Sequence, residues 1–397
     1  MLALAHEPPW RMRLPLHDDT TNHRDPSVER RALLGLSLVA GVGPQRLRAL
    51  LAAFEVPSAV FRASRTALTK VDGVGPQTAE AILAFDDRAA VEQEVARAEE
   101  LGATLVPPWD DRFPDRLHEI YDPPAYLWMR GTLPSTDAPM ITVVGTRRCT
   151  DYGRAQAHHL SAELVRRGFT VVSGLAYGVD AAAHKGALDA GGRTLAVLGS
   201  GVGRIYPQKH TGLARRIAES GAVLSEYGLD ADPDARHFPE RNRILSGLSF
   251  GTLVIESFAE GGSLITARFA LEQNREVFAL PGRITKETSR GTNRLIQRGH
   301  AKLVMDVDDL LQELPEWTVA DPGAVDAETV AANSPPAAEA LSGDAETLYE
   351  ALTDTPVHVD QLCEKTGLEP SSALPTLLEL EFEGLVRQLA GKQFRRS

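Results

Sequence analysis

The sequence predicts an α/β protein with a doubly wound parallel sheet at its centre, a helical domain before it and a small helical domain after it. Three observations predict this arrangement. Short apolar runs alternate with helical patterns through the middle of the chain, a Gly-Val-Gly-Pro-Gln string occurs twice within the helical sequence before them, and a Pro- and Ala-rich stretch precedes the last segment. A length of 397 residues suits two or three domains.

Composition narrows the class of protein. Hydrophobic residues make up 43% and charged residues 24% of the chain, as in ordinary globular domains. The net charge of −12 is uneven: residues 1–139 carry −5, residues 140–314 carry +3 and residues 315–397 carry −10. Only the middle is therefore suited to bind a polyanion. The chain has only two cysteines, which excludes a disulfide scaffold and fits a cytoplasmic location. It has no apolar run long enough to span a membrane and no recognisable signal peptide, so we expect no membrane partner.

The first part of the chain is predicted to be helical. Residues 1–27 are Pro-rich and predicted to be disordered, whereas residues 28–110 carry apolar positions at helical spacing. Within them, Gly41–Gln45 returns as Gly73–Gln77, and each string resembles the turn of a helix-hairpin-helix motif. Free N–H groups at such a turn can hold a DNA phosphate. A helix-to-helix turn without a ligand is the favoured interpretation, because the surrounding segment is acidic.

Residues 111–314 are predicted to contain the sheet. Their short, continuous apolar runs are typical of strands buried on both faces, and strands that alternate with helices form a parallel sheet. The predicted strands are Met140–Val144, Phe169–Val172, Thr194–Leu198, Ala222–Ser225, Thr252–Ile255, Val277–Ala279 and Lys302–Val304. The predicted helices are Tyr152–Arg167, Val179–Ala190, Leu213–Ser220, Arg241–Leu248, Ser263–Gln273, Asn293–Arg298 and Asp308–Leu314.

Glycine, serine and basic residues gather where these strands end. Five strand ends carry Gly, which allows close approach of a ligand to the backbone, and ligands of parallel sheets bind at this edge. Arginine forks suit phosphate oxygens. The edge is therefore predicted to bind an anion. The predicted binding residues are Gly145, Thr146, Arg147, Arg148, Ser173, Gly174, Lys185, Gly199, Ser200, Gly201, Phe238, Arg241, Asn242, Arg243, Gly262, Ser263 and Gly282.

Phe238 is the aromatic candidate of this edge. It lies between His237 and Pro239 in a polar stretch, where its ring could stack on a nucleobase. A loop residue folded onto the core is the other interpretation, and the sequence leaves both open.

Motifs of catalysis and of metal or cofactor binding are missing. The string Gly199–Arg204 breaks the spacing of a dinucleotide fingerprint, and the chain has no phosphate-binding GxxxxGK[ST] string, no serine nucleophile elbow and no HExxH. His158 and His159 would point in different directions on a helix. For His184 a structural or phosphate-facing role is favoured over catalysis. We therefore expect no catalytic residue, no metal and no cofactor.

The Gly-, Ser- and Arg-containing strings at the strand ends of the central region, together with the segments that follow them, resemble the DprA/Smf family of bacterial DNA-processing proteins. The match runs in order along nearly all of residues 140–305. The strings that carry it are Val144–Arg147, Ser173–Asp180, His184–Leu188, Tyr206–Pro207, Ser225–Tyr227, Phe238–Leu248, Gly262–Ala267, Leu280–Gly282 and Gly291–Ile296.

The resemblance implies an extended Rossmann-like domain, an N-terminal SAM-like helix-hairpin-helix domain and no enzymatic activity. It implies a recombination mediator that binds and protects incoming single-stranded DNA and loads the recombinase RecA onto it during natural transformation. It also implies a homodimer formed through the Rossmann-like domain. Carried over by position, the DNA contacts are Arg147, Lys185, Phe238, Arg241 and Arg243, with the Gly and Ser loops around them.

The end of the chain is predicted to be a winged-helix domain. Residues 315–340 are predicted to be a flexible linker and residues 341–397 to fold independently. Val359–Gly367 and Ser371–Glu381 form the predicted helix-turn-helix pair, followed by a β-hairpin. The second helix is acidic, so a protein-binding or regulatory role is favoured over contact with duplex DNA.

Two other functions are less favoured by the sequence. A nucleotide-binding phosphoribohydrolase would use a similar sheet, with Glu256 as the candidate acid, but the string that places a catalytic Glu in those enzymes is missing here. A regulator that reads duplex DNA through its last domain is disfavoured by the acidity of that domain.

Overall fold

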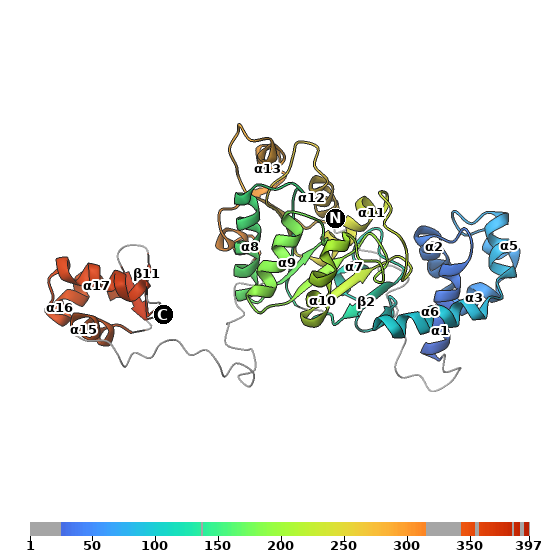
Figure 1. The fold of residues 1–397 in the computed structure, drawn as a ribbon, viewed down its shortest axis with the longest axis horizontal. Helices are drawn as coiled ribbons and strands as arrows, with labels where there is room; N and C mark the ends of the chain where they lie inside the picture. The colour runs from blue at the N-terminus through green and yellow to red at the C-terminus, as the bar shows by residue number, and fades with distance from the viewer. Residues whose placement is uncertain are drawn as a thin grey trace, which may run out of the picture. The chain divides into compact units, whose positions relative to one another are not determined.

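The computed structural model describes residues 25–135, 138–314, 343–353, 357–382, 385–389 and 393–396 (Figure 1). The chain divides into two compact units, Met1–Pro322 and Gly323–Ser397. The predicted linker 315–340 and nearly all of the predicted disordered segment 1–27 lie outside the described residues. None of the helices in the described part of the chain is long and apolar enough to span a membrane.

The helical domain has the predicted hairpin turns. Its helices are α1 (Pro26–Leu38), α2 (Pro44–Phe54), α3 (Pro57–Arg62), α4 (Arg65–Leu68), α5 (Pro76–Ala84) and α6 (Arg88–Leu101). The proline of each repeated string is the first residue of a helix, α2 or α5. Arg46 joins the two turns, because its guanidinium donates to the carbonyl oxygens of Gly41 at 2.5 Å and Gly73 at 2.7 Å. Both glycines have positive φ, +83° and +74°, a conformation that favours glycine.

A nine-stranded sheet forms the centre of the first unit. Its order is β1-β2-β6-β5-β4-β3-β7-β8-β9, and all neighbours from β6 to β9 run parallel. The order reverses between β4 and β7, which flank β3, so the ligand-binding edge is expected at the carboxyl end of β3. The strands are β1 (Ala103–Val106), β2 (Leu127–Gly131), β3 (Met140–Val144), β4 (Thr170–Ser173), β5 (Thr194–Val197), β6 (Ala222–Ser225), β7 (Gly251–Val254), β8 (Glu276–Ala279) and β9 (Lys302–Leu303).

Helices cover both faces of this sheet. Ile141 and Val143 of β3 pack among residues of α8, α9 and α14, whereas Met140 and Val144 pack among residues of α11 and α12. Side chains of one strand alternate between faces, so the parallel, doubly wound sheet is confirmed. The remaining elements of the unit are α7 (Asp115–His118), α8 (Asp151–Arg166), α9 (Val179–Asp189), η1 (Gln208–His210), α10 (Thr211–Ser220), α11 (His237–Leu248), α12 (Ser263–Glu272), η2 (Glu287–Ser289), α13 (Arg290–Gln297) and α14 (Val307–Leu311).

Two antiparallel strands extend the sheet beyond the prediction. β1 pairs with β2, and β2 pairs with β6. Strand β1 lies before residue 111, where the sheet domain is predicted to begin. The prediction includes these residues in the helical domain, because their short apolar run resembles the end of a helix. One hydrophobic core joins Leu33 and Leu50 of the helical domain to Trp128 of β2. The helical domain and the sheet therefore pack as one body.

The second unit contains the predicted winged-helix elements. Helices α15 (Asp344–Ala351), α16 (Val359–Thr366) and α17 (Pro370–Phe382) accompany the strands β10 (Val357–His358), β11 (Val386–Leu389) and β12 (Gln393–Arg396). The strands form a sheet in the order β10-β12-β11. Leu348, Leu362, Leu377 and Phe394 fill its core. The helix-turn-helix pair is confirmed within one residue of its predicted bounds, and the β-hairpin that follows it is confirmed.

Candidate functional site

The loops after β3, β4 and β7 pack against one another at the carboxyl edge of the sheet. A Cβ atom on Gly145 would lie 2.5 Å from Val179, and one on Gly178 would lie 2.4 Å from the carbonyl oxygen of Thr146. The backbone N–H of Thr146 donates to the carbonyl of Glu256 at 2.8 Å. Glycine is required at these contacts, and the close packing holds the residues that follow β3 in a defined position.

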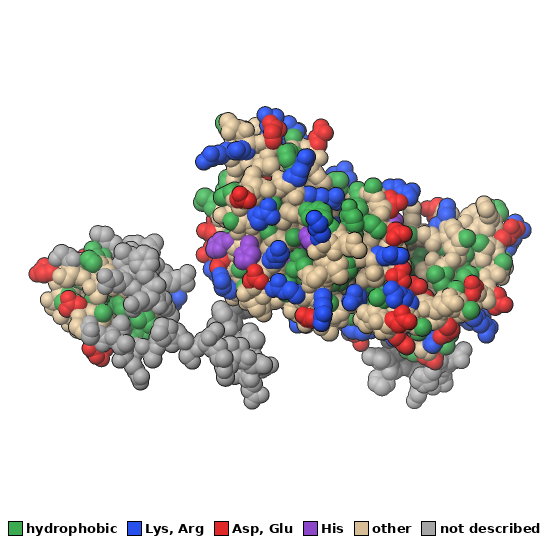
Figure 2. All heavy atoms as spheres, viewed as in Figure 1, with side chains coloured by type: hydrophobic (Ala, Val, Ile, Leu, Met, Phe, Trp, Pro, Cys, Tyr) green, Lys and Arg blue, Asp and Glu red, His purple; other side chains and the backbone are tan. Residues whose placement is uncertain are grey.

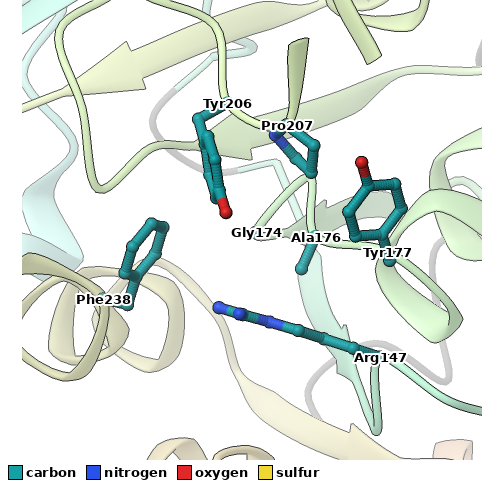
Figure 3. Close-up of a pocket in the computed structure, with 7 residues that line it drawn as sticks. All are labelled: Arg147, Gly174, Ala176, Tyr177, Tyr206, Pro207 and Phe238. Carbon is teal, nitrogen blue, oxygen red and sulfur yellow. The ribbon is translucent and has the colours of Figure 1, made fainter. Parts of the chain in front are cut away.

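A small, shallow pocket lies beside this packed region (Figure 3). Arg147 extends into it from the loop after β3, and the rings of Phe238 and Tyr206 face it from the opposite side. The central guanidinium carbon of Arg147 lies 5.3 Å from the centroid of the Phe238 ring, within range of a cation–π contact. The Tyr206 and Phe238 centroids are 5.7 Å apart. The lining residues are Arg147, Gly174, Ala176, Tyr177, Tyr206, Pro207 and Phe238.

Phe238 belongs to a helix rather than to the predicted polar loop. Helix α11 begins at His237, four residues before its predicted start. The ring is half-buried: one side rests on Gly199, where a Cβ atom would lie 2.9 Å away, and another side faces the pocket. The ring therefore packs on the strand end and still exposes part of its surface at the pocket.

Arg241, one of the predicted DNA contacts, is buried beneath this edge. Its side chain is 4% exposed, and its guanidinium donates to the carbonyl oxygens of Gly174 and Val197. Burial lowers its pKa to about 10, so it stays charged at neutral pH beside the buried carboxylate of Asp180. Arg241 sits under the edge and ties the ends of β4 and β5 together, where the sequence alone suggested a phosphate contact.

Arg243, which is also a predicted DNA contact, is buried as well. Its guanidinium binds Glu226 at 2.6 and 3.1 Å and Asp122 at 3.1 Å. Asp122 in turn pairs with Arg48 of α2. Burial raises the pKa of Glu226, and the Arg243 charge opposes that shift. These four residues link the helical domain to α11, because a buried charge requires a partner of opposite sign.

The other predicted residues divide into exposed and internally bonded groups. Arg147, Arg148, Lys185 and Gly262 are exposed, and Lys185 lies on α9 outside the seven residues of the pocket. The hydroxyls of Ser173, Ser200 and Ser263 bond to Val143, Arg204 and Ser257, and the Gly282 N–H bonds to Asn293. The Thr146 hydroxyl accepts a hydrogen bond from the Arg148 N–H, and Asn242 is half-buried. The Gly199–Gly201 loop packs under Phe238 and against Leu229.

The candidate list missed two aromatic residues of the pocket. Tyr206 and Tyr177 line it and are each 42% exposed. The Tyr177 ring meets His210 edge-on at 5.0 Å, and His210 Nδ1 lies 2.8 Å from the Leu175 carbonyl oxygen. Both tyrosines lie in strings that carry the family resemblance, and an aromatic residue beside a Gly-rich loop is the sequence signal that identifies them.

Two groups that could suggest catalysis have structural partners. The Glu256 carboxylate accepts bonds from the Thr150 N–H at 2.8 Å and the Thr150 hydroxyl at 2.7 Å, at the start of α8. His184 is fully buried, and burial lowers its pKa to about 3. No cluster of three His, Cys, Asp or Glu suited to a metal ion occurs among the described residues.

Comparisons with known proteins agree with this architecture. Residues 104–315 match the family model described as DNA recombination-mediator protein A, residues 332–392 match the DprA winged helix domain, and residues 33–85 match a SAM-like helix-hairpin-helix tandem. Protein Smf of Synechocystis is 34% identical over 91% of this chain and 98% of its own length. DNA processing protein DprA of Bacillus subtilis is 42% identical over 57% of this chain and 76% of its own.

Among solved structures, the X-ray structure of DprA from Streptococcus pneumoniae aligns with a TM-score of 0.62 and 35% identity, covering 71% of this chain and 95% of that chain. The family model covers the β1–β9 sheet and the edge that bears Arg147 and Phe238, and the two other models cover the domains on either side. The chain therefore belongs to the DNA recombination-mediator protein A family, the DprA/Smf proteins.

Proposed function

We propose that this protein binds single-stranded DNA at the carboxyl edge of its central sheet and acts as a recombination mediator. The observation that carries the proposal is the exposed guanidinium of Arg147 beside the rings of Phe238 and Tyr206. A cation for phosphate beside aromatic faces for unpaired bases is the recognition chemistry of single strands. Such a site tolerates any sequence, because every base has a stacking face.

A non-enzymatic role is part of the proposal. Glu256, the one candidate acid of the alternative phosphoribohydrolase, is 5% exposed and caps the start of α8 with both carboxylate oxygens. A general acid must reach the leaving group of a substrate, and this carboxylate is held by the loop instead. Its geometry favours a structural role.

Loading of RecA onto incoming single strands in the cytoplasm during natural transformation completes the proposal. Membership of the recombination-mediator family supports it. Homodimerisation through the sheet domain is the other part, and its proposed surface is the exposed edge at β9. Leu303 is 40% and Met305 71% exposed there. Apolar side chains at an unpaired strand edge are suited to bind a second copy.

Binding is tested by titrating a fluorescent poly-dT oligonucleotide with the full-length protein at two salt concentrations, with an equal-length duplex as competitor. We expect salt-sensitive binding that the duplex does not displace, and weaker binding by Arg147→Gln. Arg215→Gln is the matched control, because Arg215 is an 82%-exposed arginine of α10. Competition by duplex, or release of a free base from a nucleoside monophosphate, would contradict the proposal. RecA assembly on a strand coated with single-strand-binding protein tests the loading step.

A further inference from the structure

The two consecutive arginines after β3 cover aromatic rings from different parts of the fold. Arg147 lies over Phe238 of α11, whereas the guanidinium carbon of Arg148 lies 5.5 Å from the centroid of Phe258, which follows β7. Since β3 lies between β4 and β7, the two pairs stand on opposite sides of the point where the strand order reverses. The edge therefore offers the same arginine–aromatic arrangement twice.

Phe258 is held firmly by the segment that leads into α13. Its carbonyl oxygen accepts from the Gly261 N–H at 3.0 Å. The preceding residue, Ser257, donates its N–H to Thr288 at 2.7 Å and accepts from the Gly291 N–H at 2.8 Å. Gly291 approaches so closely that a Cβ atom there would lie 2.5 Å from the Phe258 carbonyl. The backbone that bears the half-buried ring is thus held in place before any ligand arrives.

Helix α13 carries an exposed row of arginines next to this ring. Arg290, Arg294 and the following Arg298 recur every four residues, so they lie on one face and step about 6 Å along the axis. The opposite face packs Leu295 and Ile296 into the core. Figure 2 shows blue side chains gathered at the α13 end of the molecule.

Little in the described structure neutralises this row. Residues 281–300 contain five basic side chains and a single acidic one, Glu287. Glu287 pairs with Arg290 at 3.1 Å, and both side chains are more than half exposed, so the pair is weak. Within the described residues, no ion pair to Arg294 or Arg298 is found. A row of cations of which, in the described part of the chain, Arg290 alone has a weak ion pair, beside an exposed part of an aromatic ring, is suited to a polyanion whose bases are free to stack.

We propose that Arg148 and Phe258 form a second base-stacking position for a single strand, and that the arginines of α13 bind its phosphates beyond that position. The inference rests on the proposed function, since it extends the strand from the Arg147–Phe238 pocket across the end of β3. A short oligonucleotide occupies the first position alone. A longer one reaches Phe258 and α13, and it gains both a stacked base and phosphate contacts.

The test measures affinity of the full-length protein for dT oligonucleotides of about 4 to about 20 nucleotides, a range around the site sizes of single-strand-binding domains. Phe258→Leu removes the ring and keeps an apolar side chain, and Arg148→Gln leaves the packing of that loop untouched. Phe269→Leu is the matched control, because Arg268 covers Phe269 at 5.7 Å on α12. We expect Phe258→Leu and Arg148→Gln to lower the affinity for long oligonucleotides and to leave the affinity for the shortest unchanged. For Phe258→Leu the expected loss of affinity is about 5- to 150-fold.

Arg294→Gln tests the phosphate contacts. Its slope of log affinity against log salt is expected to fall by about 0.7 on long oligonucleotides, the effect of one lost single-strand phosphate contact. Arg215→Gln should leave the slope unchanged.

The possible outcomes separate this inference from the proposed function. A wild-type protein that binds no oligonucleotide overturns both. If the wild type binds, and Phe258→Leu, Arg148→Gln and Arg294→Gln all keep its affinity and salt slope, only the second position is overturned. The α13 arginines would then be available to bind a protein partner instead of DNA. Equal loss at every length by Phe258→Leu and Arg148→Gln also overturns it, because Phe258 would then belong to the first position.

Discussion

The guanidinium of Arg147 lies over the ring of Phe238, 5.3 Å from its centroid, although the two residues are about 90 positions apart. The contact joins the loop after β3 to the first turn of α11. It brings charge and aromatic surface together at the edge where parallel sheets bind ligands.

Phe238→Leu and Arg147→Gln are expected to weaken single-strand binding for different reasons. Loss of the ring removes stacking worth about 1–3 kcal/mol and leaves the salt dependence of affinity unchanged. Loss of the arginine lowers the slope of log affinity against log salt by about 0.7. Titrations at four salt concentrations measure both effects. Identical salt slopes in wild type and Arg147→Gln would show that Arg147 does not contact phosphate.

Arg243→Met is expected to destabilise the fold by about 3–5 kcal/mol, because it leaves the buried Glu226 carboxylate without its partner. Urea denaturation measures the loss. Arg236→Met is the control, since Arg236 is 81% exposed and its pair with Asp234 contributes little. Adding Glu226→Gln to Arg243→Met should recover part of the stability. A fully stable Arg243→Met protein that has lost only DNA affinity would restore the original sequence-based role of Arg243.

Gly186→Ala is expected to destabilise the contact between α8 and α9. A Cβ atom at Gly186 would lie 2.1 Å from the carbonyl oxygen of His158, so the helices must separate, at a cost of about 1–3 kcal/mol. Gly212→Ala in α10 is the comparison, because no atom lies within 4 Å of its Cβ position. Alanine there should raise stability by up to about 1 kcal/mol. Thermal unfolding of the pair distinguishes packing from helix propensity, and equal melting temperatures would argue against the close approach.

His184 is expected to make the fold sensitive to mild acid. Its Nδ1 lies 2.7 Å from the Thr194 hydroxyl, which donates to Val171, so His184 is the donor and is neutral. Burial lowers its pKa from 6.5 to about 3, so the unfolded chain binds the proton first. The stabilisation is complete above pH 6.5 and is lost as pH falls toward 3, by at most about 1.4 kcal/mol per pH unit.

Denaturation midpoints at several pH values between 6.5 and 4 measure this effect. His184→Asn keeps a donor for Thr194 and should flatten the profile between these values. His159→Asn is the control, because His159 is exposed on α8 and should leave the profile as in the wild type. An unaltered pH profile in His184→Asn would assign the acid sensitivity to other groups.

The sequence by itself determined the three domains, the parallel sheet and the edge that carries the site. Apolar runs with period 2 or 3.6 report burial directly, and glycines at strand ends report close backbone approach. Gly145, a predicted residue of this edge, is one position where a Cβ atom would clash, at 2.5 Å from Val179. The antiparallel strands β1 and β2 were missed, because their partners lie far away in the sequence.

The tertiary structure alone decided which basic residues are available to a ligand. In the sequence, Arg147, Arg241 and Arg243 are equivalent candidates for a phosphate contact. In the structure, Arg147 is exposed, whereas Arg241 and Arg243 are buried against carbonyl oxygens and carboxylates. Helix α11 begins at His237, so Phe238 faces the pocket from the first turn while the next turn points its arginines inward. Charge and residue type are properties of the sequence, whereas the partner of a charge depends on which distant atoms the fold places beside it.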